Sequence, residues 1–201
     1  MAFINVREKL IQIKIVYYGP GRGGKTTNLE YIYSKYTNRA KTQLVSIKTH
    51  GDRTLFFDFL PFDMGKIAGY DTVIQLYTVP GQVKYEATRR LVLKGVDGIV
   101  FVADSIKEKE EDNIFSYNNL KENLELYSKD IKNMPLVFQY NKRDLASLGI
   151  PLLSVKTLES QLNSELKAPY FEASALKGIN VVNTLKKIVV LTMNVLQREL
   201  E

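Results

Sequence analysis

The sequence contains no cysteine among its 201 residues. It can therefore form neither disulfides nor thiolate metal sites, and it offers no cysteine for prenylation or palmitoylation. Long apolar runs are also missing, since none approaches the roughly 20 residues that a membrane-spanning helix needs. Arg7, Glu8 and Lys9 interrupt the N-terminal segment, and no glycine follows Met1, so we expect neither a signal peptide nor a myristoylation site. These absences predict a soluble cytoplasmic protein without an integral membrane segment.

The size and the charge of the chain indicate its number of domains and the class of its partners. A chain of 201 residues and 23.0 kDa suits a single domain over 1–201 with a sizeable core. The formal charge of +6 and the pI near 9.3 favour an anionic partner such as phosphate, nucleic acid or an acidic membrane surface. The basic residues are scattered rather than gathered into one run, so this signal selects no partner by itself.

Short apolar runs alternate with helix-length segments along the chain. We predict strands at 12–18, 54–62, 72–79, 98–105, 135–141 and 169–174, and helices at 25–36, 84–94, 113–128, 155–167 and 179–199. Nearly unbroken apolar strands belong in a sheet that is covered on both faces, and their alternation with helices indicates parallel βαβ units. The sequence therefore predicts a doubly wound α/β fold with a mostly parallel sheet and helices on both faces.

One connection is too short for a crossover helix. Only PFDMGKIAG separates the strands expected at 55–60 and 71–78, which predicts one antiparallel edge strand. In open sheets of this kind, ligands bind beyond the carboxyl ends of the strands. The loops that follow each strand are therefore the ones to examine.

The loop after the first long strand reads GPGRGGKT. Gly19, Gly24, Lys25 and Thr26 meet the pattern G-x-x-x-x-G-K-[ST], with a strand before and a helix after, as phosphate binding requires. Backbone N–H groups could converge on phosphate oxygens at the helix N-terminus, Lys25 would reach the outer phosphates, and Thr26 would offer its hydroxyl to Mg²⁺. The other expected contacts from this segment are Gly21, Gly23 and Thr27.

Two later loops favour guanine as the base. NKRD follows the strand at 135–141, and the carboxylate of Asp144 can accept hydrogen bonds from both N1–H and the exocyclic amine of guanine, a donor pair that adenine lacks. Asn141 would support this loop and contact the base edge, while the Lys142 stem covers the ring. In EASALKG, the N–H of Ala175 is expected to meet guanine O6 and Ser174 to brace Asp144. Asn and Asp are common in turns after strands, so NKRD alone is only moderately specific. The prediction of a guanine nucleotide site depends on the joint occurrence of GPGRGGKT, NKRD and EASALKG, each at the end of a strand.

The chain resembles the Ras-like small GTPases from GPGRGGKT through TVPGQ and NKRD to EASA. It is most similar to the MglA family of bacterial polarity GTPases, in GPGRGGKTTNL, DRTLFFDFLPFD, LYTVPGQVKY and LVLKGVDGIVFVADS. The resemblance implies a P-loop NTPase fold and a GTP-dependent switch that controls cell polarity and surface motility, with possible recruitment to a cell pole. It also implies a roadblock-type, MglB-like partner that stimulates hydrolysis, and effectors that the sequence does not identify.

TVPGQ departs from the wider group at its first position. Most Ras-like proteins carry an aspartate where this chain has Thr78, and that aspartate holds Mg²⁺ through a water. Threonine is the residue of the MglA pattern, so the departure supports the narrower resemblance. Gly81 lets the backbone approach the γ-phosphate, and Gln82 stands where the water-positioning glutamine is expected.

A long polar stretch, 37–54, precedes the strand TLFFDF and resembles a segment that γ-phosphate and Mg²⁺ would order. Thr54 at its end would complete Mg²⁺ coordination together with Thr26. Arg53 is the candidate for an internal arginine finger, against the alternative of a solvated arginine at a strand start. His50, the only histidine, is expected on the surface rather than as a base.

Three functions remain open at this point. The first is a regulatory GTPase that hydrolyses GTP. The second is a GTP-dependent scaffold that does not hydrolyse, in which Thr78 marks lost chemistry. The third is a nucleic-acid-binding P-loop protein. It is supported only by the net positive charge, and the sequence shows no cluster of aromatic and basic residues on which single-stranded nucleic acid could stack. We therefore expect no nucleic-acid partner.

Overall fold

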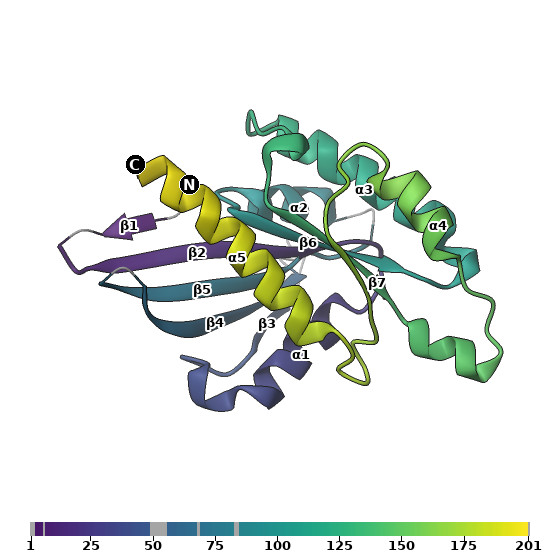
Figure 1. The fold of residues 1–201 in the computed structure, drawn as a ribbon, viewed down its shortest axis with the longest axis horizontal. Helices are drawn as coiled ribbons and strands as arrows, with labels where there is room; N and C mark the ends of the chain where they lie inside the picture. The colour runs from purple at the N-terminus through teal and green to yellow at the C-terminus, as the bar shows by residue number, and fades with distance from the viewer. Residues whose placement is uncertain (1–2, 6, 49–55, 68, 83–84, 201) are drawn as a thin grey trace.

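Eight strands pair into one mixed sheet among the residues that the computed structural model describes, which are 3–5, 7–48, 56–67, 69–82 and 85–200 (Figure 1). The strands are β1 (Phe3–Asn5), β2 (Leu10–Tyr18), β3 (Val45–Lys48), β4 (Phe56–Ile67), β5 (Tyr70–Thr78), β6 (Gly98–Asp104), β7 (Leu136–Asn141) and β8 (Tyr170–Glu172). The main helices are α1 (Lys25–Lys35), α2 (Glu86–Leu93), α3 (Glu110–Glu125), α4 (Val155–Leu158) and α5 (Val181–Leu200).

The strand order is β3-β4-β5-β2-β6-β7-β8, with β1 paired to β2 outside this path. Pairing is parallel from β5 through β2, β6 and β7 to β8. It is antiparallel between β3 and β4, between β4 and β5, and between β1 and β2. The carboxyl ends of the parallel strands therefore meet at one edge of the sheet, where their loops lie together.

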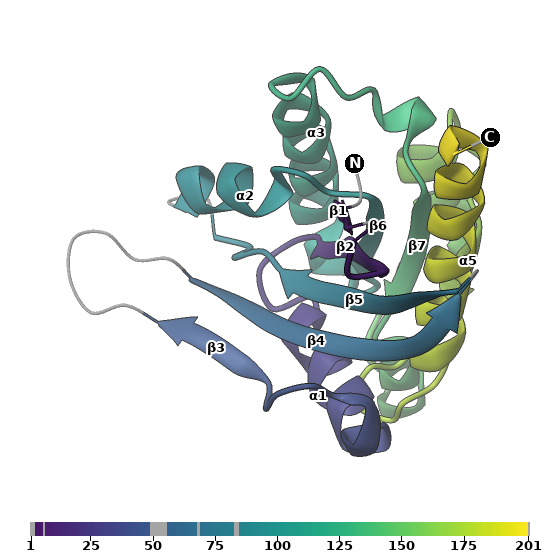
Figure 2. The same cartoon turned by 90° about the vertical axis from the view of Figure 1, so that its left-hand side faces the viewer.

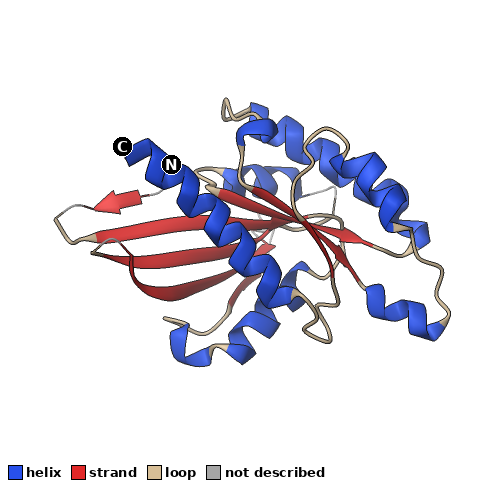
Figure 3. Cartoon of the chain, in the orientation of Figure 1, coloured by secondary structure: helices blue, strands red, loops and turns tan. Residues whose placement is uncertain are grey.

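Helices cover both faces of the sheet (Figure 3). Figure 2 shows α1 and α5 on one side and α2 and α3 on the other. Each side has its own apolar core, with Leu29 and Ile188 in the first and Val92 and Leu120 in the second. Every residue of β6 and β7 is buried, because both faces of these central strands are covered. No helix among the described residues is long and apolar enough to cross a membrane.

The doubly wound α/β prediction is confirmed, with corrections to the antiparallel part. β4 extends to Ile67, through most of the segment that we expected to be a connection, and it turns into β5 within two residues. The 37–54 stretch, expected to lack strands, contains β3, which pairs with β4 and takes the edge position that the sequence assigned to β4. β1 was also missed. β1 and β3 pair over only three and four residues, and neither carries a long apolar signal, which explains why the sequence did not predict them.

The prediction of one helix over 155–167 is wrong in its second half. The regular α-helix ends at Leu158, and residues 159–163 form a π-helical turn. Asn163 then accepts a hydrogen bond from the N–H of Ala168 and donates one to its carbonyl, at 2.8 Å each. This side-chain pairing satisfies the backbone of the following turn and ends the helix there.

Candidate functional site: a nucleotide-binding edge of the sheet

The phosphate loop joins β2 to α1, and Gly24 is the N-cap of that helix with φ of 99°. Lys25 lies inside the loop: its Nζ donates hydrogen bonds to the carbonyls of Gly19 at 2.9 Å and Pro20 at 2.6 Å. The lysine is only 6% exposed, and this burial lowers its pKa to about 7, although the charge of Asp58 acts in the opposite direction. Negative phosphate oxygens at this place would raise the pKa again, so the loop suits an anion.

Close approach of neighbouring loops explains two of the glycines. A Cβ on Gly24 would lie 2.1 Å from the side-chain nitrogen of Asn141, and a Cβ on Gly81 would lie 2.2 Å from the backbone nitrogen of Gly21. The first contact joins the phosphate loop to the loop after β7. The second places the loop after β5 directly against the phosphate loop. Glycine is required at both positions because any side chain would separate these loops.

A cavity of about 810 Å³ opens beside these loops. Its walls include the predicted residues Gly21, Gly23, Gly24, Lys25, Thr26, Thr27, Gly81 and Gln82. The cavity is also lined by residues of α3, among them Phe115 and Asn119, and by Arg89 of α2. The structure thus gathers the phosphate-loop and TVPGQ residues around one open space.

A carboxylate that the sequence did not single out forms part of this wall. Asp58 of β4 is 8% exposed, and its Oδ2 accepts hydrogen bonds from the hydroxyls of Thr26 at 2.5 Å and Thr78 at 2.8 Å. The N–H of Asp58 donates back to Thr78 Oγ1 at 3.0 Å. One signal in the sequence pointed to it, since FFDFLPF places a charge within an apolar strand, and a buried charge needs partners.

The base-side loops are tied together by Asn141. Its Nδ2 donates to the Gly23 carbonyl, and its Oδ1 accepts from the N–H of Ala175, both at 2.8 Å. This N–H is the one expected to meet guanine O6, so in this structure it already has a protein partner. Asn141 is 1% exposed, which identifies its role here as support of the two loops.

The remaining base-side residues have the following partners. Lys142 has a left-handed backbone with φ of 69°, and its Nζ forms an ion pair with the buried Asp104 at 2.6 Å. Ser174 Oγ accepts from the N–H of Lys177 at 3.1 Å, and the described part of the chain shows no hydrogen bond from Ser174 to Asp144. The expected bracing of Asp144 by Ser174 is therefore not present in this arrangement. The cavity of 810 Å³ does not extend to these loops.

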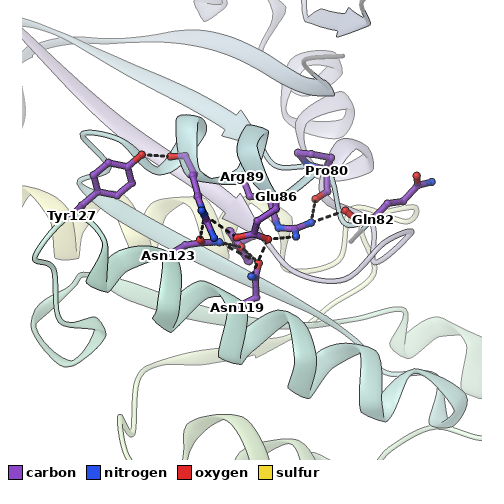
Figure 4. A network of polar contacts seen from close by, with 9 residues as sticks. Pro80, Gln82, Glu86, Arg89, Asn119, Asn123 and Tyr127 are labelled. Atoms are coloured by element: carbon purple, nitrogen blue, oxygen red, sulfur yellow. Dashed lines mark hydrogen bonds and ion pairs between the residues drawn. The ribbon is translucent and has the colours of Figure 1, made fainter. Parts of the chain in front are cut away.

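Gln82 lies at the start of a polar network that runs from its loop through α2 to α3 (Figure 4). Arg89, 3% exposed, donates from Nη1 to the carbonyl of Gln82 at 2.6 Å and to that of Pro80 at 3.4 Å. Its Nη2 forms an ion pair with Glu86, which also accepts from Asn119 at 3.0 Å. Burial of Glu86 alone would raise its pKa, but the hydrogen bonds from Arg89 and from α3 outweigh it, so the pKa is lowered. The backbone beside Gln82 is thus anchored to two helices.

Comparison with known proteins now identifies the family. A model of the Ras family matches residues 14–194. The mutual gliding-motility protein MglA of Myxococcus xanthus is 48% identical over 198 residues, which cover 98% of this chain and 99% of that protein. The chain belongs to the Ras family, within its MglA group. It is a small GTPase that binds GTP and hydrolyses it.

More distant Ras-family relatives match most of the chain as well. Ras-related protein Rab7 of Pisum sativum is 26% identical over 179 residues, 88% of this chain and 80% of that protein. Ras-related protein Rab-7a of Dictyostelium discoideum is 25% identical over 182 residues, 90% of this chain and 82% of that protein. The Ras-family model itself covers residues 14–194, which include the loops at the carboxyl edge of the parallel sheet.

Three of the predicted residues lie outside the described part of this GTPase. They are Arg53, the candidate arginine finger, Thr54, the second candidate Mg²⁺ ligand, and His50. The β4 strand begins just after them, at Phe56, and leads to Asp58 at the cavity wall. Their roles stay predictions.

The oxygen atoms around Thr26 are suitable ligands for a hard cation such as Mg²⁺. Ras-family GTPases use Mg²⁺ with GTP, and Mg²⁺ prefers oxygen ligands and bound water over an all-protein cage. The hydroxyls of Thr26 and Thr78 both lie within hydrogen-bonding distance of the Asp58 carboxylate, so oxygen ligands gather here. No cluster of three or more His, Cys, Asp or Glu side chains that could hold a metal occurs in the described ranges, so a metal here would depend on phosphate oxygens as well.

Proposed function

We propose that this GTPase is a switch that controls cell polarity and surface motility in a bacterial cell. The observation that carries the proposal is the 48% identity to the M. xanthus gliding-motility protein over nearly the full length of both chains. The chain would act as one domain over residues 1–201 in the cytoplasm, with recruitment to a cell pole in one nucleotide state. Its partners would be a roadblock-type, MglB-like activating protein and effectors that recognise the GTP-bound form.

Mg²⁺ would be bound with GTP by the hydroxyls of Thr26 and Thr54. The metal supplies positive charge beside the phosphates when bound. The hydroxyl of Thr26 faces the cavity wall, where it donates to Asp58. Lys25 and the N–H groups at the start of α1 would neutralise the remaining phosphate charge.

The base would be held by the loops after β7 and β8. Asp144 would accept from N1–H and the exocyclic amine of guanine, and the stem of Lys142 would cover the ring. Asn141 supports this geometry, because it connects both loops to Gly23 of the phosphate loop. Ala175 and Ser174 would then approach the base once the loops adjust around it.

Gln82 and Arg53 would carry the hydrolysis step. Phosphoryl transfer leaves a protein little covalent chemistry, so the rate depends on orienting water and on neutralising the developing charge. The contact between Gly81 and Gly21 supports the role of Gln82, because it places that loop against the phosphate loop at the cavity. Arg53 would supply the positive charge from within the chain, and the activator would arrange both residues.

Multiple-turnover GTP hydrolysis with saturating roadblock-type activator tests this proposal. We expect Arg53→Ala and Gln82→Leu to keep near-normal GTP affinity and to lose roughly 10³- to 10⁵-fold of the stimulated rate, the range that an arginine finger contributes in GTPases. The matched control is Arg39→Ala, in the 3₁₀ turn after α1 and away from the cavity.

Each contrary result has a distinct meaning. Stimulated hydrolysis that is unchanged in Arg53→Ala would show that the charge comes from elsewhere, including from the activator. A parent protein that binds GTP but does not turn over with any activator would favour the scaffold function instead. Comparison of proteins captured by GTP-loaded and GDP-loaded chain would then identify the effectors of either form.

A further inference from the structure

The missing aspartate at position 78 leaves this GTPase without the usual carboxylate at the end of β5. Thr78 occupies that position, is 3% exposed, and cannot supply a negative charge. The neighbouring strand restores one. β4 runs antiparallel to β5 with Phe59 opposite Tyr77, so Asp58 lies opposite Thr78. A carboxylate therefore stands beside the same threonine position, on the next strand of the sheet.

The contacts of Asp58 direct this carboxylate towards the phosphate end of the cavity. Its Oδ2 lies 2.5 Å from the hydroxyl of Thr26, the residue expected to bind Mg²⁺, and 2.8 Å from the hydroxyl of Thr78. Asp58 also lines the cavity, together with the buried Lys25. The carboxylate, the threonine hydroxyl and the lysine thus surround the place where outer phosphates would lie.

The burial of Asp58 needs an explanation beyond the strand itself. A carboxylate that is 8% exposed loses most of its hydration, and such a group is retained only with strong partners. The hydroxyls of Thr78 and Thr26 each donate a hydrogen bond to the carboxylate, and Thr78 Oγ1 also accepts from the backbone N–H of Asp58 at 3.0 Å. This pairing orients the carboxylate towards Thr26.

We propose that Asp58 supplies the negative charge that holds Mg²⁺ beside Thr26, in place of the aspartate that other Ras-like proteins carry at position 78. Thr78 has become the residue that orients this carboxylate. The inference rests on the proposed use of Mg²⁺ with GTP and assigns to it a residue from a different strand. Asp58 is a positioning residue for the metal, and Thr78 is a positioning residue for Asp58.

The test measures how much free Mg²⁺ the protein needs to retain a fluorescent GTP analogue, with an arm in excess EDTA. We expect Asp58→Asn to raise the Mg²⁺ concentration for half-maximal retention by about 10- to 100-fold, the range seen when groups that orient a metal site are removed. Affinity in EDTA should change by less than about threefold, because the phosphate loop and base loops are untouched. Asp63→Asn is the matched control, since it removes the same charge from the same strand where Asp63 is half exposed.

A second variant separates the metal role from a merely structural one. Asp58→Asn combined with Thr78→Asp moves the carboxylate back to β5, and its Mg²⁺ requirement should return to within about threefold of the parent. Thermal melting checks that each variant folds. Should Asp58→Asn alone fail to fold, the double variant decides: a requirement that stays tenfold above the parent overturns the proposal.

Two other outcomes would also overturn it. An unchanged Mg²⁺ requirement in Asp58→Asn would make the carboxylate a structural partner of Thr78. A lower requirement would show that Asp58 competes with the metal for Thr26. If the parent itself retains the analogue equally with Mg²⁺ and with EDTA, the failure lies in the proposed use of Mg²⁺ rather than in Asp58.

Discussion

The base end and the phosphate end of the candidate site are built in different ways. At the base end, the side chain of Asn141 connects the loops after β2, β7 and β8 through hydrogen bonds to Gly23 and Ala175. At the phosphate end, Thr26 comes from a helix, while Thr78 and Asp58 come from two antiparallel strands. The first arrangement depends on loops that each follow a parallel strand. The second depends on which strands are neighbours and on their register.

This difference separates two kinds of function. Under the proposed function, loops at the base end would recognise one ligand and would need a fixed shape, which the buried Asn141 supports. The phosphate end would respond to one phosphate group, and it joins the cavity to α2 and α3 through Arg89 and Glu86 (Figure 4). Changes at the base end should therefore alter which nucleotide binds, whereas changes at the phosphate end should alter what happens to it.

The largest effect should come from the base end. Asp144→Asn replaces two acceptors with an amide that matches the carbonyl of xanthine, so the preference between GTP and the xanthine nucleotide should shift by roughly 10⁴-fold, as expected for a polar site with mismatched partners. Nucleotide competition measures the ratio. Asp71→Asn, at the amino end of β5, is the control and should change nothing. Unchanged GTP selectivity in Asp144→Asn would show that Asp144 does not recognise the guanine base.

Lys25→Ala tests the loop that both ends share. Loss of the buried ammonium should weaken GTP binding by roughly 10²- to 10³-fold, because the phosphate charge loses its partner. Circular dichroism should show the fold intact, although Lys25 is buried and bonded to two loop carbonyls. Lys35→Ala, exposed at the end of α1, serves as control. Loss of the helical spectrum in Lys25→Ala would identify the lysine as structural.

Asn141→Ala should have a smaller effect on both stability and binding. It leaves the N–H of Ala175 and the carbonyl of Gly23 without this partner, which costs about 1–3 kcal/mol for each group that stays buried. We expect chemical denaturation to show a loss of about 2–4 kcal/mol and GTP affinity to fall by about 10- to 100-fold. Asn183→Ala, exposed on α5, should leave both unchanged. Unaltered affinity in Asn141→Ala would mean that the base end does not depend on this link.

Arg89→Lys should give the smallest effect and act on the phosphate end alone. Lysine keeps the charge but lacks the planar fork that reaches both the Gln82 carbonyl and Glu86. Hydrolysis should slow by about tenfold while GTP affinity stays within about threefold, the pattern of a group that acts on the reaction step. Arg90→Lys, half exposed on the same helix, is the control. An equal fall in affinity and rate would contradict this division between the two ends.

The sequence by itself determined the features that are local along the chain. GPGRGGKT could be recognised from consecutive residues, because the glycine pattern follows an apolar strand and precedes a helix. The structure places Lys25 and Thr26 of this motif at the cavity. The periodic apolar residues of 179–199 also gave the last helix to within two residues. NKRD and EASALKG follow their strands for the same reason, since each signal is contained in a few consecutive residues.

The tertiary structure decided the features that depend on pairing between segments. β1 and β3 each pair antiparallel with the next strand along the chain, but they have only three and four residues, so no local pattern marked them. The partner of Asn141 at Gly23, 118 residues away, could not be read from NKRD alone. Asp58 belongs to the site only because β4 pairs with β5 in one register, and a shift by one residue would turn its side chain to the opposite face.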